Sequence, residues 1–385
     1  MAHLTTRVAS LLPSATEIVC ALGAQDTLVG VSHECDFPAG VADLPALTRA
    51  RLKPVTTSRD IDTDVRAILQ DALAVYEIEL DRLATARPEL IVTQDLCDVC
   101  AVSLDDVRAT VAKLARRDDI RIVNLRPMRL GDIWDDIARV AASLARPETG
   151  ARVVDDLRAR VADIQARSAA CDGRPRVLSI EWIDPVMIGG MWMPELIALA
   201  GGTALVTRPG DHAPTLTREA LAALSPDVVL VKPCGFPLAR TLDELETLRA
   251  SLPWNEWAAV RAGRVYVADG NAYFNRPGPR LVESLEILAA CVHPVAFADF
   301  QRKHCGTVVR LEADLRFAAG IAPLTFEPGT LVLYAAAGTA TVELSGDSVE
   351  LAPADAVQVE SDEPIAITLR SGIIAAASIR ALSPR

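Results

Sequence analysis

The chain has 385 residues, of which 50% are hydrophobic and 23% charged, and its formal net charge is −12. That length accommodates two or three domains, and the acidic balance argues against a general nucleic-acid-binding protein and against a basic membrane-surface protein. The sequence has no run of about 18 uncharged apolar residues, so we expect no membrane insertion.

The first part of the chain alternates short apolar strands with amphipathic helices. The expected strands lie at 8–12, 28–32, 90–93 and 120–125. The expected helices lie at 15–22, 61–75 and 104–115. Strands separated by helices are typical of βαβ units and of a mostly parallel sheet.

A helical stretch follows and separates two similar α/β regions. Apolar residues recur on one helix face at Ile133, Ile137, Val140 and Leu144, and Pro147 precedes a second such set. The α/β pattern then restarts, with strands expected at 177–180, 186–188, 228–231 and 265–268. Helices are expected at 194–199, 218–224, 242–248 and 281–290.

The end of the chain alternates short β-rich runs with turns, which predicts a small all-β sandwich or barrel. The expected domains are an N-terminal α/β lobe at 1–128, a helical connector at 129–171, a second α/β lobe at 172–305 and a β-rich domain at 306–385.

Polar residues, thiols and aromatics follow four of the expected strands, at 32–38, 93–100, 232–236 and 269–280. Ligands of open α/β sheets bind at the carboxyl ends of the strands. We therefore expect these loops to line a ligand cleft, with ordinary strand-to-helix turns as the alternative. A further segment, Met187 to Met193 around Gly189 and Gly190, fits either an apolar cleft wall or the core packing of one turn.

The chain has eight cysteines and shows no secretion signal, since its apolar opening is broken by Pro13 and charged at Glu17. A reducing cytoplasmic location is therefore expected, with thiols or metal ligands in place of disulfides. Cys97 and Cys100 form a C-x-x-C pair, and Cys35 and Cys234 occupy the matching loops of the two lobes.

Four sulfurs that converge suit zinc, copper(I) or an iron–sulfur cluster. A redox pair at Cys97 and Cys100, or thiols that only line the pocket, are the alternatives. His33, Glu34 and Asp36 could act as a general acid and base pair or could form a polar wall of the pocket.

Several segments together resemble class III substrate-binding proteins of ABC importers, and their cobalamin-binding branch in particular. These are residues 7–17, 28–32, 36–38, 87–91 and 276–280, and the resemblance extends over about residues 6–295. It implies two Rossmann-like lobes joined by a long helix, with a cleft between them whose loops contribute aromatic and polar side chains. The β-rich tail weakly resembles a cupin-like β-barrel; it has no histidine, so we expect it to hold no metal.

These observations lead to a first hypothesis: a cytoplasmic protein that holds a corrinoid (a cobalamin-like molecule) or another metal-containing small molecule between its lobes, without catalysis. The candidate ligand-binding residues are Pro13, Ser14, His33, Glu34, Gln94, Met187, Trp192, His212, Tyr273 and Arg276. The candidate metal ligands are Cys35, Cys97, Cys100 and Cys234.

Two alternatives remain, an enzyme that uses a metal or iron–sulfur cluster on these cysteines, and the binding component of an importer. The tail is expected to contact a second copy or another protein.

Overall fold

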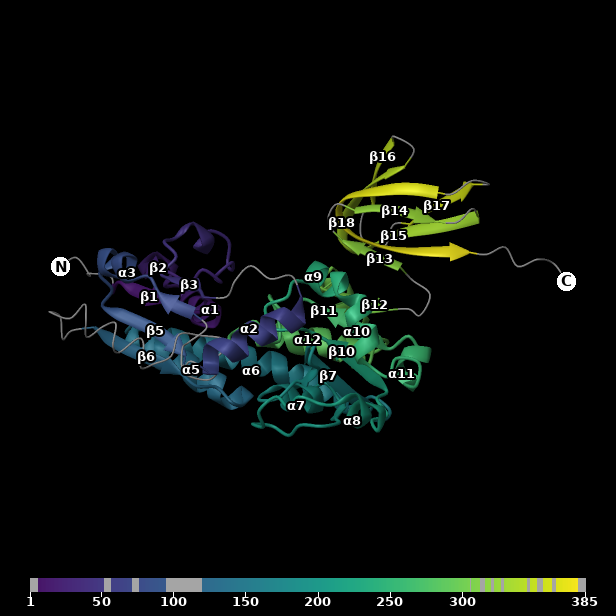
Figure 1. Ribbon diagram of the computed structural model, residues 1–385. Helices are drawn as coiled ribbons and strands as arrows, with labels where there is room; N and C mark the ends of the chain where they lie inside the picture. The colour runs from purple at the N-terminus through teal and green to yellow at the C-terminus, as the bar shows by residue number, and fades with distance from the viewer. Residues whose placement is uncertain are drawn as a thin grey trace.

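The computed structural model describes residues 6–51, 57–70, 76–94, 120–304, 306–311, 316–319, 322–326, 329–344, 347–351, 356–361 and 365–379. Figure 1 shows two α/β lobes joined by helices, with the C-terminal sheet above the second lobe. Within these residues, every helix is too short or too polar to cross a membrane.

The first lobe is built on a four-stranded parallel sheet in the order β2-β1-β5-β6. Its strands are β1 (Val8–Ser10), β2 (Leu28–Gly30), β5 (Leu90–Gln94) and β6 (Arg121–Leu125). Its helices are α1 (Pro13–Ala21), α2 (Ser58–Gln70) and α3 (Leu80–Ala86), with short 3-10 turns at Gln25–Thr27 and Val41–Asp43. β5 is buried along its whole length, as expected for a central strand that is covered on both faces.

The expected helix at 104–115 lies outside the described residues, as does the end of the helix expected at 61–75. Two strands were not expected, β3 (Thr48–Ala50) and β4 (Tyr76–Ile78), which form an antiparallel pair. Each has three residues and carries a charged one, so neither shows the apolar alternation that marks a strand.

The connector consists of α5 (Leu130–Ser143) and the long α6 (Pro147–Ala169). The chain turns between them at Ala145, which has a positive φ of 55°, and Pro147 then begins α6. The two helices pack closely at Gly150, where a Cβ would lie 2.4 Å from that of Ala141. A side chain at this position would therefore push the helices apart.

The second lobe has a sheet in the order β12-β11-β10-β7-β8, with β9 paired to β7. The strands are β7 (Arg176–Trp182), β8 (Met187–Ile188), β9 (Thr203–Ala204), β10 (Val228–Val231), β11 (Val265–Ala268) and β12 (Val308–Leu311). The helices are α7 (Met193–Leu199), α8 (Arg218–Ala222), α9 (Leu238–Asp243), α10 (Leu245–Ser251), α11 (Ala258–Arg261), α12 (Leu281–Val292) and α13 (Ala298–Lys303).

An additional antiparallel sheet follows the second lobe, with the order β13-β18-β15-β16, β14 paired to β18, and β17 paired to β15. Its strands are β13 (Arg316–Ala319), β14 (Ala322–Phe326), β15 (Gly329–Leu344), β16 (Asp347–Leu351), β17 (Ala356–Ser361) and β18 (Ile365–Ile379). The α/β class, the two lobes with their helical connector and the C-terminal β region are thus confirmed. The expected domain limits stay a prediction, and β12 pairs with β11 of the second lobe although it lies beyond residue 305.

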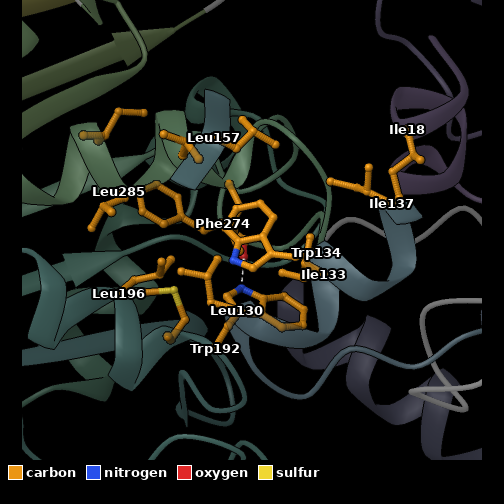
Figure 2. Close-up of a cluster of buried hydrophobic side chains, with 14 of the residues drawn as sticks. Ile18, Leu130, Ile133, Trp134, Ile137, Leu157, Trp192, Leu196, Phe274 and Leu285 are labelled. Carbon is orange, nitrogen blue, oxygen red and sulfur yellow. Dashed lines mark hydrogen bonds between the residues drawn. The ribbon is translucent and has the colours of Figure 1, made fainter. Parts of the chain in front are cut away.

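One hydrophobic core joins both lobes and the connector. It runs from β1 and α1 through α5 and α6 to α7 and α12. Figure 2 shows its centre, where Trp134 of α5 lies beside Trp192 and Phe274 of the second lobe. The other face of the second sheet has its own core, and so does the C-terminal sheet.

Candidate functional site

A cluster of charged residues joins the two lobes. Arg276, in the loop after β11, forms ion pairs with Asp36 and with Glu17 of α1, and its Nη2 lies 3.0 Å from Asp36 Oδ2. Arg280 donates two hydrogen bonds to Glu17, from Nη2 to Oε1 at 2.6 Å and from Nε to Oε2 at 3.1 Å. Asn271 donates to Asp36 at 2.9 Å. We call these five residues, Glu17, Asp36, Asn271, Arg276 and Arg280, the inter-lobe ion cluster.

The inter-lobe ion cluster stabilises the charged forms of Arg276 and Asp36. Glu17 and Arg276 are buried, with 3% and 7% of their surface exposed. Burial alone would lower the pKa of Arg276, but the hydrogen bonds and charges of Asp36 and Glu17 raise it above its ordinary value. Burial likewise works to raise the pKa of Asp36, and Arg276 lowers it overall. Two carboxylates thus balance two guanidinium groups.

A second polar group lies in the first lobe, on the loop after β2. His33 Nδ1 is 2.8 Å from Thr48 Oγ1, and its Nε2 is 3.4 Å from Glu34 Oε1. Tyr76 donates to the same Glu34 oxygen at 3.3 Å, and its ring meets His33 edge to face. The hydrogen bond from His33 is the main reason that the pKa of Glu34 is lowered. This arrangement fits a polar wall held by side-chain contacts.

A third polar group lies in the second lobe, at the carboxyl ends of β7 and β10. Lys232 is fully buried, and its Nζ lies 2.9 Å from both Glu181 Oε2 and Asn275 Oδ1. Asn275 donates in turn to the carbonyl oxygens of Lys232 and Gly270. A Cβ on Gly270 would lie 2.0 Å from the carbonyl oxygen of Pro233, so only glycine allows these two loops to approach so closely.

The candidate residues of the first lobe lie near the carboxyl ends of β1, β2 and β5. Pro13 begins α1, and Ser14 and Gln94 are buried. Within the part of the chain that the structure describes, Ser14 Oγ and Gln94 Oε1 have no hydrogen-bond partner. Gly278 of the second lobe lies against Ser14, at 3.4 Å from a built Cβ to the Ser14 carbonyl oxygen. Ser14 is therefore covered by the second lobe in this structure.

The candidate residues of the second lobe are spread over three environments. Tyr273 is half-buried beside the Arg280 guanidinium, and burial raises the pKa of its phenol. Met187 is half-buried in β8, and His212 is exposed in the loop that packs its backbone against Gly190. The structure places Trp192 in the core and not at a cleft wall. Its Nε1 donates to the Phe274 carbonyl oxygen at 2.8 Å, as Figure 2 shows.

The cysteines do not form a metal-binding group in the part of the chain that the structure describes. Cys97 and Cys100 lie outside the described residues, and no group of three or more His, Cys, Asp or Glu side chains suited to a metal occurs among the others. Cys35 is buried in the core, 3.1 Å from Thr16 Oγ1, and burial raises its pKa to about 11. The role of Cys35 as a metal ligand stays a prediction. Cys234 is a half-buried free thiol.

Two surface hollows lie away from these groups. One, of about 700 Å³, is lined by Arg7, Arg87 and Glu89 at the opposite edge of the first sheet, where β5 begins. The other, of about 300 Å³, lies between α6 and α7 and is lined by Ser168, Arg174 and Glu195 among others.

Two lobes on Rossmann-like sheets, joined by a long helix, define a class III binding protein. Residues 8–272 match the family model of periplasmic binding proteins, and the chain belongs to that family. It is 24% identical to the vitamin B12-binding protein of Vibrio cholerae over 284 residues, which is 73% of this chain and 86% of the relative. It is 22% identical over 300 residues to an uncharacterized ABC transporter substrate-binding lipoprotein of Bacillus subtilis, covering 76% of this chain and 82% of the relative.

Solved structures show the same fold. The periplasmic vitamin B12-binding protein of Vibrio cholerae aligns with 75% of this chain and 97% of its own, at a TM-score of 0.53 and 22% identity. A periplasmic heme-binding protein from Roseiflexus aligns with 77% of this chain and 99% of its own, at 0.56 and 22% identity. The expected cytoplasmic location is wrong on this comparison, because the family and these relatives are periplasmic or, in Bacillus, a lipoprotein.

Sequence reasoning did not select Glu17, Arg280, Lys232 or Glu181 as site residues. Two signals were available. Glu17 is an acid within an otherwise apolar helix, and Lys232 directly follows a buried apolar strand. A buried charge needs a partner of opposite charge. Glu17 pairs with arginines of the other lobe, and Lys232 pairs with Glu181 of the neighbouring strand β7.

Proposed function

We propose that this protein is the substrate-binding component of an ABC importer and that it holds a corrinoid between its two lobes. The main support is the extent of the match. The vitamin B12-binding relatives align over 284 residues, and the family match at 8–272 includes the first lobe, the connector and most of the second lobe. The inter-lobe ion cluster and the polar groups at His33 and Lys232 place polar side chains at the carboxyl ends of strands in both lobes, where a ligand of an α/β sheet would bind.

Heme is the second candidate, because solved heme-binding proteins share this fold at similar TM-scores. The neighbouring His33 and Tyr76 favour it, since an imidazole nitrogen and a phenolate oxygen both bind heme iron in proteins. Either ligand would be cargo, and no step of catalysis is part of this proposal. The metal-dependent enzyme remains the alternative from another class.

Ligand titration tests the proposal. We expect cyanocobalamin, added to the full chain, to saturate at micromolar concentrations and to raise the melting temperature as ligand is added, because a ligand that binds only the folded state stabilises it. Hemin serves as the parallel probe. Saturation by hemin and not by cyanocobalamin would replace the corrinoid by heme. A brown protein with iron and labile sulfide, which binds neither probe, would instead favour the enzyme.

A variant of His33 tests whether the ligand binds next to this residue. His33→Ala should weaken binding about tenfold if His33 contacts the ligand, which corresponds to the loss of one good polar contact. His293→Ala is the matched control, since that imidazole lies at the end of α12 and contacts the Gly201 carbonyl oxygen. Equal affinities for the two variants would remove His33 from the proposed site.

A further inference from the structure

The beginning of α2 reaches across to the second lobe. The backbone N–H of Ser58 donates to both carboxylate oxygens of Glu244, at 2.9 and 3.1 Å. Ser58 is fully buried and Glu244 is 7% exposed. The first N–H groups of a helix have no partner within the helix and favour a negative charge. A carboxylate of the second lobe therefore caps a helix of the first.

Two further contacts hold the same helix end. Arg59 binds Asp184 through two parallel bonds, Nη2–Oδ1 at 2.6 Å and Nε–Oδ2 at 2.8 Å. Trp182 Nε1 donates to the Ser58 carbonyl oxygen at 3.2 Å. Asp184 and Trp182 are mostly buried, so the second lobe provides a firm surface for the exposed Arg59.

The contacting groups of the second lobe are themselves held in place. Trp182 ends β7, and its ring packs against Phe236 at 5.1 Å between centroids. Glu244 lies between α9 and α10 and also accepts a bond from Arg240 at 3.0 Å. The C-terminal sheet packs on the same helix α9 through β13, and Figure 1 shows the two side by side.

This bridge is separate from the inter-lobe ion cluster. The cluster joins α1 and the loop after β2 to the segment around Arg276, whereas the helix bridge joins α2 to the end of β7 and to α9. The helix bridge thus adds a second set of polar contacts to the second lobe. Thr57 Oγ1 also accepts a bond from the Asp60 N–H within α2, so release of α2 from the second lobe removes only the Glu244 contact of this helix end and breaks a two-point ion pair.

We propose that Ser58, Arg59, Trp182, Asp184 and Glu244 form a latch that holds the start of α2 on the second lobe, and that α2 leaves the second lobe only when these contacts break. The latch uses side chains that bind each other and needs no ligand. Its failure in the test below is therefore distinct from failure of the proposed ligand.

Hydrogen exchange on the full chain, without ligand, tests the latch. Glu244→Ala and Arg59→Ala should each speed amide exchange at the start of α2, by about three- to tenfold, and Asp184→Asn should act like Arg59→Ala. The double variant Arg59→Ala with Asp184→Asn should exchange no faster than the faster single variant, because both changes remove one ion pair. Exchange in the core helix α12 reports that each variant is folded.

The control is Arg66→Ala, which removes an arginine of the same helix whose ion pair, among the described residues, is with Asp62 of α2. It should leave exchange at the start of α2 unchanged. Trp182→Phe keeps an aromatic side chain but removes the N–H and part of the indole, and it should cause a smaller increase because the Glu244 and Arg59 contacts remain. The proposal is overturned if the latch variants exchange like the wild type, or if Arg66→Ala speeds exchange as much as they do.

Discussion

Burial in the core shifts the pKa of one carboxyl group, that of Asp136. Asp136 of α5 is fully buried, and its Oδ2 has no hydrogen-bond partner among the described residues. Burial raises its pKa to about 6 although Arg139 works against this. The folded protein therefore binds a proton here more tightly than the unfolded chain does. Stability is greatest while Asp136 is protonated and decreases as the pH rises through the interval between about 4 and 6.

Asp136→Asn should relieve this cost. We expect the variant to be more stable than the wild type by about 1–3 kcal/mol at pH 8 and equal to it within error at pH 4, because only the ionised form carries the penalty. Urea unfolding at both pH values measures it. Asp135→Asn, on the exposed side of the same helix, is the control and should have no such pH-dependent effect. A gain of equal size at both pH values would mean that charge is not the cause.

For single residues, the sequence predicted which loops carry the polar side chains better than it predicted their ion-pair partners. His33, Tyr273 and Arg276 do lie in loops at the carboxyl ends of strands, because a buried apolar strand followed by polar residues is a local signal. The partners of Arg276 come from α1 and from the loop after β2, far away in the chain, and no local pattern connects them. The sequence left a cleft wall and core packing open for the segment of Trp192, because both require the same apolar residues, and Trp192 lies in the core.

At the scale of elements, one carboxylate joins three helices. Glu286 of α12 lies 2.8 Å from Arg160 of α6, 2.7 Å from Lys303 of α13 and 2.6 Å from His304 at the end of α13. Burial would raise the pKa of Glu286, but hydrogen bonds from His304, Lys303 and Arg160 lower it to about 2. The stability that this group contributes is thus complete above pH ~4.5 and is lost as the pH falls towards 2.

Glu286→Gln should therefore destabilise the protein by about 2–3 kcal/mol at pH 7 and by much less at pH 3. Denaturant unfolding at the two pH values is the measurement. Glu283→Gln is a matched control on the same helix, because Glu283 also binds Arg160 but is more exposed. If both variants lose the same stability, then the contacts of Glu286 with all three helices do not stabilise the protein more than the single contact of Glu283 does.

Element boundaries followed from the sequence where burial is complete. The strands at 228–231 and 265–268 were predicted at their observed limits, since each is an apolar run between polar residues. The helix expected at 242–248 is instead two helices that meet at Glu244. Glu244 forms contacts with Arg240 and with Ser58 of the other lobe, and such a distant contact leaves no periodic signal.

For the whole molecule, the shared core predicts how the lobes unfold. All five tryptophans, at 134, 182, 192, 254 and 257, belong to the connector or the second lobe, and Trp134 and Trp192 lie in the core that includes both lobes. We expect tryptophan fluorescence to show one cooperative transition in urea, coincident with the loss of helix seen by circular dichroism. Two separate transitions, one for each lobe, would contradict a shared core.

The C-terminal sheet has a core of its own and no tryptophan, so it is silent in this experiment. Its presence was predictable from alternating β-rich runs and turns. The location of the protein was not, because a short apolar opening is ambiguous on its own, and comparison with relatives corrected it.

The shared core also limits how a partner protein can distinguish the ligand-bound protein from the empty one. Halves that share packed side chains from α1 to α12 cannot swing apart without exposing the buried surface between them, which costs free energy in proportion to its area. We therefore expect a bound ligand to change the arrangement of loops at the boundary between the lobes more than the separation of the lobes. A partner that distinguishes the ligand-bound protein from the empty one would then have to contact those loops.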